Sequence, residues 1–102
     1  MYVILWDFEI APYRTAEFES IYSPQGEWRR LFAQAPGYLG TELLQSADSL
    51  WRFLTIDRWA CEEDFAHFQQ EFGEPYSALD AQCQRLTRSQ RKLGAFVEAD
   101  PQ

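Results

Sequence analysis

Residues 50–68, LWRFLTIDRWACEEDFAHF, contain two different periodicities in one short stretch. Up to Trp59 the stretch is rich in β-branched and aromatic residues, which is typical of a strand. Three acidic residues then fill what would be the first turn of a helix, where negative charge interacts favourably with the helix dipole. An apolar stripe at helical spacing follows, made of Cys61, Phe65, Phe68 and Phe72. The stretch therefore predicts a strand at 50–59 followed by a helix at 61–72.

The same patterns place the remaining elements of the chain. Residues 2–10, YVILWDFEI, predict a first strand. A helical period from Thr15 to Pro36 is broken near Ser23, which is expected to cap a second helix with Pro24 at its first position. The later elements are a strand at 38–46, a break at 73–75, a second helical segment at 76–86 and a last strand at about 91–98.

The element order is βαββαβ, the α+β arrangement called ferredoxin-like. Its helices can cover only one face of a four-stranded antiparallel sheet. Yet the strands at 2–10 and 50–59 are apolar on both faces; in the second, Leu54 and Ile56 lie opposite Trp51, Phe53 and Trp59. A sheet with one solvated face would alternate more cleanly between apolar and polar residues. We therefore expect a homodimer that buries the second faces of two sheets against each other.

Length and composition limit the possible functions. The 102 residues are 46% hydrophobic and 17% aromatic, which predicts one globular domain spanning 1–102. A net charge of −7 argues against nucleic-acid or membrane partners and favours a neutral, cationic or apolar ligand. The apolar run at the N-terminus is too short for a signal peptide or a membrane span. Cys61 and Cys83 lack metal-binding spacing and are interpreted as reduced thiols of a cytoplasmic protein.

His67 is the only histidine and therefore a candidate for a catalytic role. On a helical wheel it falls outside the arc of the apolar stripe. Its helical neighbours are acidic: Glu63, Asp64 and Glu71. We predict that His67 is exposed and takes no part in a reaction.

Trp59 has two interpretations that the sequence leaves open. It ends its strand on the same face as Thr55 and Asp57. It is either a core residue at the strand–helix junction or one wall of a pocket between sheet and helices. In the second case the facing walls come from the first strand and the first helical region: Trp6, Phe8, Tyr22, Trp28 and Phe32. Many large flat side chains in one layer pack with difficulty and leave clefts.

Three segments resemble the antibiotic biosynthesis monooxygenase (ABM) domain family. They are FESIYSPQGEWRRLFAQAPGYLGTELLQ at 18–45, LTIDRW at 54–59 and DFAHF at 64–68. The resemblance covers nearly the whole chain and implies a dimeric α+β barrel, in which two subunits join through their sheets. Members of this family include oxygenases that convert polycyclic phenols to quinones with O2 and without metal or flavin. Other members degrade haem, and many have no known activity.

The resemblance also bears on single positions. In the cofactor-free oxygenases a tryptophan matches Trp59, and an asparagine stands where this chain has Thr55. The haem degraders have an asparagine where this chain has Trp6, and a histidine that falls near Pro75 or Tyr76. The third haem determinant, a tryptophan, matches Trp59. Because the other two are absent, haem degradation is disfavoured.

The leading expectation is a cofactor-independent monooxygenase that acts on a flat aromatic small molecule, such as a phenol or quinone. Its expected catalytic residues are Trp59, Asp57 as the base, and Tyr76 as a hydrogen-bond donor to a substrate oxygen, a role that Tyr22 could share. Its expected substrate-binding residues are Trp6, Phe8, Tyr22, Trp28, Phe32 and Thr55. No cofactor or metal is expected. The alternative is a non-catalytic dimer that binds a small hydrophobic molecule or serves as a scaffold.

Overall fold

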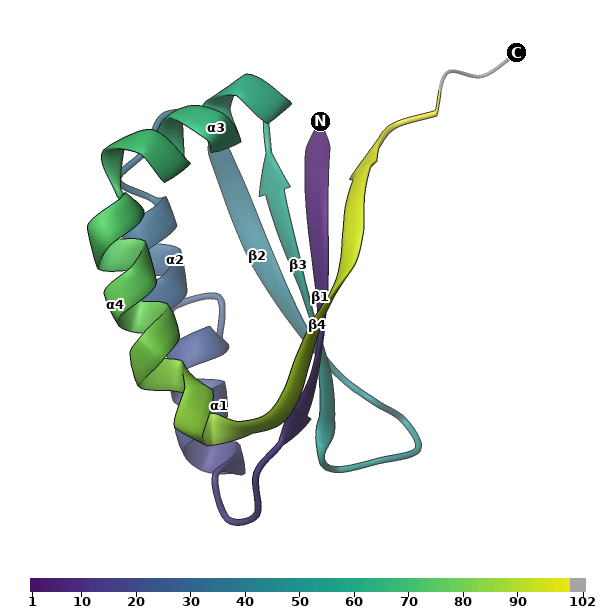
Figure 1. Cartoon of the computed structure of the whole chain (residues 1–102). Coiled ribbons are helices and arrows are strands. Elements are labelled where there is room, and N and C mark those ends of the chain that lie inside the picture. The colour runs from purple at the N-terminus through teal and green to yellow at the C-terminus, as the bar shows by residue number, and fades with distance from the viewer. Residues whose placement is uncertain (100–102) are drawn as a thin grey trace.

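The fold is that of a computed structural model, which describes residues 1–99. Within these residues the elements are β1 (Tyr2–Ile10), α1 (Thr15–Tyr22), α2 (Glu27–Phe32), β2 (Tyr38–Gln45), β3 (Arg52–Trp59), α3 (Glu62–Glu71), α4 (Gly73–Cys83), a 3₁₀ turn η1 (Gln84–Leu86) and β4 (Thr87–Val97). The strands form one antiparallel sheet in the order β2-β3-β1-β4. All helices lie on one face of this sheet (Figure 1). The predicted ferredoxin-like α+β fold is confirmed.

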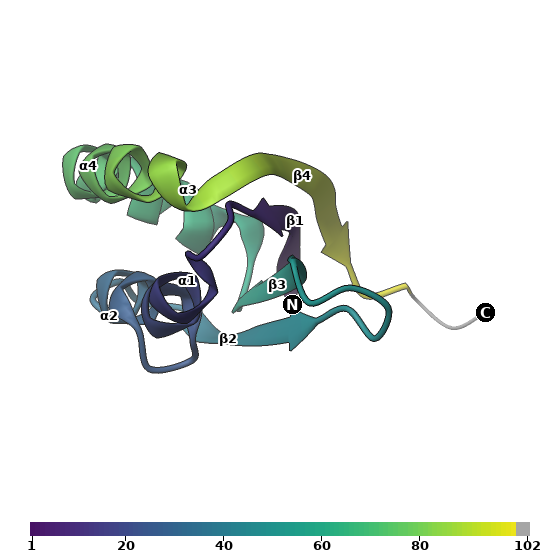
Figure 2. The ribbon, with the colours of Figure 1, turned by 90° about the horizontal axis from the view of Figure 1, so that it is seen from below.

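The core lies between the sheet and the helices. Along β1 and β3 alternate side chains face the helices, so that Phe8 pairs with Phe53 and Tyr2 with Trp59 across the two strands. Figure 2 shows the helices as two neighbouring pairs, α1 with α2 and α3 with α4. Their buried residues include Phe18, Ile21, Leu31, Phe32, Phe68 and Leu79. Period-2 strands and period-3.6 helices therefore bury one common apolar layer.

The turn between α1 and α2 differs from the prediction. Gly26, not Ser23, is the N-cap of α2, and Pro24 lies in the turn before the helix. A Cβ atom on Gly26 would lie 2.2 Å from the carbonyl oxygen of Ile21. Only glycine permits this close approach of two backbone segments, so the helix begins after it.

Three further boundaries were predicted wrongly. Pro75 is the third residue of α4, and the N–H groups of a first helical turn have no acceptor within the helix, so a proline is tolerated there. Residues 73–75 therefore begin this helix instead of breaking it. β4 begins at Thr87 rather than near residue 91, because polar residues are tolerated on an edge strand. Trp51 precedes β3 and is 52% exposed instead of facing the helices.

Each edge strand contains an extra residue that the neighbouring strand does not match. Leu39 is the extra residue in β2, and β4 has two opposite β1, Arg88 and Leu93. Leu39 and Leu93 are each followed by a glycine with a positive φ, Gly40 at 144° and Gly94 at 150°. Such β-bulges bend the strand and increase its local twist.

The face of the sheet that carries no helix is partly apolar. Val3, Leu5, Leu54 and Ile56 are half-buried there, and Leu44 is 45% exposed. The pairing of Val3 with Phe96 places another exposed ring on this face. Ion pairs between Asp7 and Arg52 and between Glu42 and Arg58 also lie on it. Both faces of the central strands are therefore apolar, as predicted.

The single histidine and the two cysteines are candidates for reactive side chains. His67 is exposed on α3, whereas Phe65, Phe68 and Phe72 of the same helix pack on the core. The thiols of Cys61 and Cys83 are free. Among residues 1–99, no three histidine, cysteine or acidic side chains come together as metal ligands. In the same range, no helix has the length and apolar character needed to cross a membrane.

Trp59 is completely buried, with ring centroids of Phe32, Tyr38, Phe65 and Phe68 at 5.3–5.7 Å. We predict that Trp59→Ala lowers the free energy of unfolding by about 3–5 kcal/mol in urea denaturation, because it leaves a large cavity. Trp59→Phe should cost less, since it retains most of the packing and removes an indole N–H that has no hydrogen-bond partner. Trp51→Ala is the control, expected within about 1 kcal/mol of the unmodified protein. Equal losses at both positions would contradict this view of the core.

Candidate functional site

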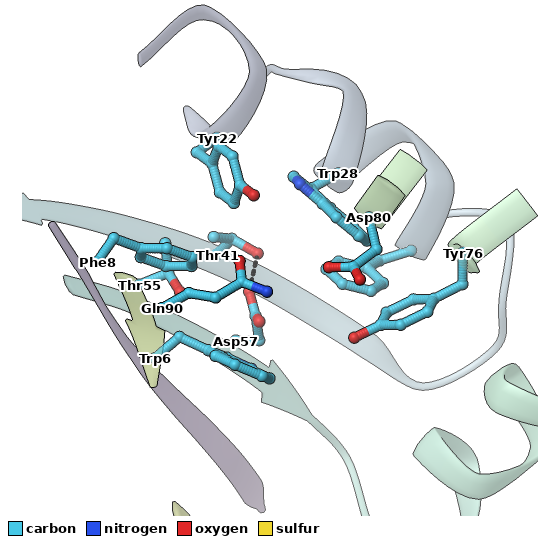
Figure 3. Close-up of a pocket in the computed structure, with 11 residues that line it drawn as sticks. Trp6, Phe8, Tyr22, Trp28, Thr41, Thr55, Asp57, Tyr76, Asp80 and Gln90 are labelled. Atoms are coloured by element: carbon cyan, nitrogen blue, oxygen red, sulfur yellow. Dashed lines mark hydrogen bonds between the residues drawn. The ribbon is translucent and has the colours of Figure 1, made fainter. Parts of the chain in front are cut away.

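A cavity lies between the sheet and the helices (Figure 3). About 440 Å³ in and at the mouth of this cavity is free of protein atoms, and the centre of a water molecule can occupy about 40 Å³ of it. Eight of the nine residues predicted for the site line it: Trp6, Phe8, Tyr22, Trp28, Phe32, Thr55, Asp57 and Tyr76. The cavity is thus a narrow aromatic slot rather than an open bowl.

Strand register brings the sheet side of the slot together. Trp6 of β1 lies opposite Thr55 of β3, and Thr41 of β2 lies opposite Asp57 of β3. Because alternate residues of a strand share a face, Thr55 and Asp57 both point toward the helices. Gln90 of β4 joins them, since it pairs with Phe8.

The helices supply the opposite wall. Tyr22 ends α1 and Trp28 lies in α2. Tyr76 and Asp80 are four residues apart on α4 and therefore share one face of this helix. The Tyr76 ring meets the Trp28 ring edge-on at 5.2 Å between centroids.

Asp57 is the buried acid of the cavity, with only 8% of its surface exposed. Burial in this aromatic surrounding raises the pKa of its carboxyl group to about 6. The Thr41 hydroxyl opposes this shift in pKa by donating a hydrogen bond of 2.7 Å to Asp57 Oδ1. The Tyr38 hydroxyl lies 2.6 Å from Thr41 Oγ1, and it must be the donor because Thr41 has given its only proton to Asp57.

Neutral hydrogen-bond donors surround the same space. Burial raises the pKa of both Tyr22 and Tyr76, which keeps their hydroxyl groups protonated. The Trp28 indole nitrogen is buried and has no hydrogen-bond partner. In Figure 3 the Tyr22 and Tyr76 hydroxyl groups point into the space between sheet and helices. The site can therefore stabilise an oxygen atom of a bound molecule without using a cationic side chain.

Trp59 is the predicted site residue that does not line the cavity. It lies two residues beyond Asp57, at the end of β3, where Phe32 and Tyr38 cover its ring. The fully buried indole therefore belongs to the core and has no surface for a ligand.

Three residues of the cavity were missed in the sequence: Thr41, Asp80 and Gln90. Asp80 could have been found, because it follows Tyr76 by four residues on a predicted helix. Thr41 could be found only with the register of β2 on β3. Gln90 lay outside the predicted range of the last strand.

Comparison with known proteins identifies the relatives of this chain. The family model described as antibiotic biosynthesis monooxygenase matches residues 1–74. A search of the curated proteins found no match.

Several solved structures have a similar fold. A mutant of SnoaB from Streptomyces nogalater, a cofactor-independent oxygenase, is 21% identical with a TM-score of 0.76, covering 98% of this chain and 94% of that chain. PA3566 from Pseudomonas aeruginosa is 16% identical with a TM-score of 0.69, covering 97% and 94%. A NIPSNAP domain protein from Burkholderia xenovorans is 17% identical with a TM-score of 0.69, covering 97% and 95%. At these identities the likeness concerns the fold. The family match covers well over half of the sequence, and the chain therefore belongs to the antibiotic biosynthesis monooxygenase family.

Proposed function

We propose that this protein is a cofactor-independent monooxygenase that oxidises a flat aromatic phenol to a quinone. The observation that carries the proposal is Asp57, a carboxylate inside an aromatic slot with a pKa of about 6. A general base is most effective when its pKa lies near the working pH. The family membership of the chain and the cofactor-independent oxygenase of similar fold support the same chemistry.

The reaction would begin with proton transfer from the phenol to Asp57. The resulting anion is electron-rich at the ring carbon opposite the oxygen, where O2 adds and takes back a proton to give a hydroperoxide. Loss of water from this carbon leaves a second carbonyl group. One atom of O2 thus enters the product, and the other leaves as water with the two hydrogens that the phenol loses.

The remaining side chains would orient the substrate and stabilise its oxygen. Tyr76, Tyr22 and the unpartnered Trp28 N–H can donate hydrogen bonds to an anionic oxygen. Trp6 and Phe8, whose rings stack at 6.2 Å between centroids, offer a flat wall to a flat ring. Thr41 holds the Asp57 carboxylate in place through its hydrogen bond.

The alternative is a protein that binds a small hydrophobic molecule without turnover. The centre of a water molecule can occupy only about 40 Å³ of the slot, so under either function a molecule of two or three fused rings requires side chains to move. Binding of the phenol without consumption of O2 would support this alternative and exclude the oxygenase.

We also infer that two copies join through the uncovered sheet faces. The half-buried residues Val3, Leu5, Leu54 and Ile56 form the apolar centre that such an interface needs. Arg58 and Glu42 pair beside them and would lie at its polar rim.

Asp57→Asn tests the base. We expect O2 uptake with hydroxylated anthrones and naphthols to fall by about 100-fold or more, the scale of general-base catalysis. In the unmodified protein, kcat/KM should rise with pH around an apparent pKa near 6. Asp48→Asn, in an exposed turn, should behave like the unmodified protein. Full activity of the Asp57→Asn variant would refute the assignment.

The same residue makes a prediction for stability. The folded-state pKa of Asp57 exceeds the usual 3.8, so ionisation of this carboxyl group destabilises the folded protein. This destabilisation is absent below about pH 4 and appears as the pH rises toward 6 and above. The Asp57→Asn variant should therefore gain stability over the unmodified protein across this range, on the order of 3 kcal/mol at pH 8. Asp7→Asn should lower the stability at pH 8, because the hydrogen bond from Arg52 lowers the pKa of Asp7 and the ionised carboxylate therefore stabilises the folded protein. Urea denaturation at pH 4 and pH 8 measures both differences.

The dimer is tested at the centre of the sheet face. Static light scattering at micromolar concentration should give twice the chain mass. The interface itself should bury at least roughly 1,500 Å² in total. Ile56→Asp places a charge in the apolar centre and should yield monomers or weaken association by at least tenfold. Leu50→Asp, at a residue that is 67% exposed outside the sheet, is the matched control. A monomeric unmodified protein would contradict the inference.

A further inference from the structure

The cavity contains two carboxylates and no basic side chain. Asp57 reaches it from β3 and Asp80 from α4. None of the lining residues is a lysine, arginine or histidine. Within residues 1–99 neither carboxylate forms a salt bridge; the paired arginines are engaged elsewhere, such as Arg85 with Glu17. The slot thus concentrates negative charge that the protein does not balance.

Both carboxylates keep hydrogen-bonding capacity for a ligand. Asp57 accepts a hydrogen bond at Oδ1 from Thr41, whereas Oδ2 receives none among the described residues. Asp80 has no hydrogen bond from any side chain in that range. Figure 3 shows the Asp80 carboxylate between the Trp28 and Tyr76 rings, directed toward the cavity. Asp80 is only partly buried, so both of its carboxylate oxygens can be reached by a donor group of a ligand.

The aromatic walls favour the same kind of group. The faces of Trp and Tyr rings attract cations, and more strongly where water is excluded. Trp28, which is 7% exposed, and Tyr76 offer such rings next to Asp80. The net charge of −7 adds a long-range attraction for cations.

We infer that the slot selects an aromatic molecule that carries a protonated amine, with its ring between Trp6 and Trp28 and its ammonium group at Asp80. This inference rests on the proposed function only in taking the ring as the one that Asp57 deprotonates. The two acids then have separate roles, Asp57 as base and Asp80 as counter-ion. The ammonium charge would also offset the negative charge that deprotonation leaves on the ring.

The test uses three ligands of one shape: 1-naphthylmethylamine as the cation, 1-naphthalenemethanol as the neutral analogue and 1-naphthoate as the anion. We expect calorimetric titration at pH 8 to give about tenfold tighter binding of the cation than of the alcohol, and the weakest binding for the anion. Asp80→Asn should remove most of the preference for the cation, leaving only what the Asp57 carboxylate provides, and should change the affinity for the alcohol by less than about twofold. Asp80→Glu should retain much of the preference.

Glu74→Gln removes one negative charge from the same helix outside the cavity and controls for the overall charge of the protein. It should leave the preference unchanged. Equal affinities for the three ligands, or an undiminished preference in a folded Asp80→Asn protein, would overturn the inference but not the oxygenase proposal. Failure of all three to bind would overturn the inference and the aromatic site together. Oxidation of a neutral naphthol without any charge preference would refute the inference alone.

Discussion

The position of β3 between β1 and β2 is the constraint on which the site depends. This pairing places Thr55 opposite Trp6 of β1 and Asp57 opposite Thr41 of β2, so β3 brings the polar residues of the slot next to both neighbouring strands. Side chains alternate along a strand, and a slip of one residue would turn Asp57 to the uncovered face and bring Ile56 into the slot. The buried Phe53 and Trp59 on the same face oppose such a slip, because it would expose both rings. Core packing therefore fixes the position of the acid.

That acid is placed at a cost to folding. A carboxylate among aromatic rings is less stable when charged, and one hydroxyl from Thr41 offsets only part of this. Elsewhere the chain places acids where arginines meet them, as at Asp7. The contrast between Asp57 and Asp7 is the kind of local inconsistency that marks functional sites. The cavity thereby combines an apolar wall with a proton acceptor.

Much of this could be predicted from the sequence because alternation and helical period are local signals. The strand patterns of residues 2–10 and 50–59 predicted the two central strands, and the residues that share one face of them include Thr55 and Asp57 of the slot. Other features depend on tertiary contacts that no local pattern reports. Gly26 caps α2 because the Ile21 carbonyl comes within reach of it, and Gln90 enters the slot because a polar edge strand begins early. Trp59 is a large aromatic residue like those that line the slot. It lies beyond the end of the slot, however, where it is buried in the core.

The extra residues in β2 and β4 have a consequence for self-association. Both strands form the outer edges of the sheet, and an edge with regular spacing is a template on which another chain can add its own strand. Leu39 and Leu93 interrupt this spacing, and the twist they introduce turns the free backbone groups out of line. Growth of the sheet into an extended ribbon is thereby opposed at both ends, although its broad face is apolar. The apolar face of the sheet is thus exposed without edges that offer a regular template for fibres.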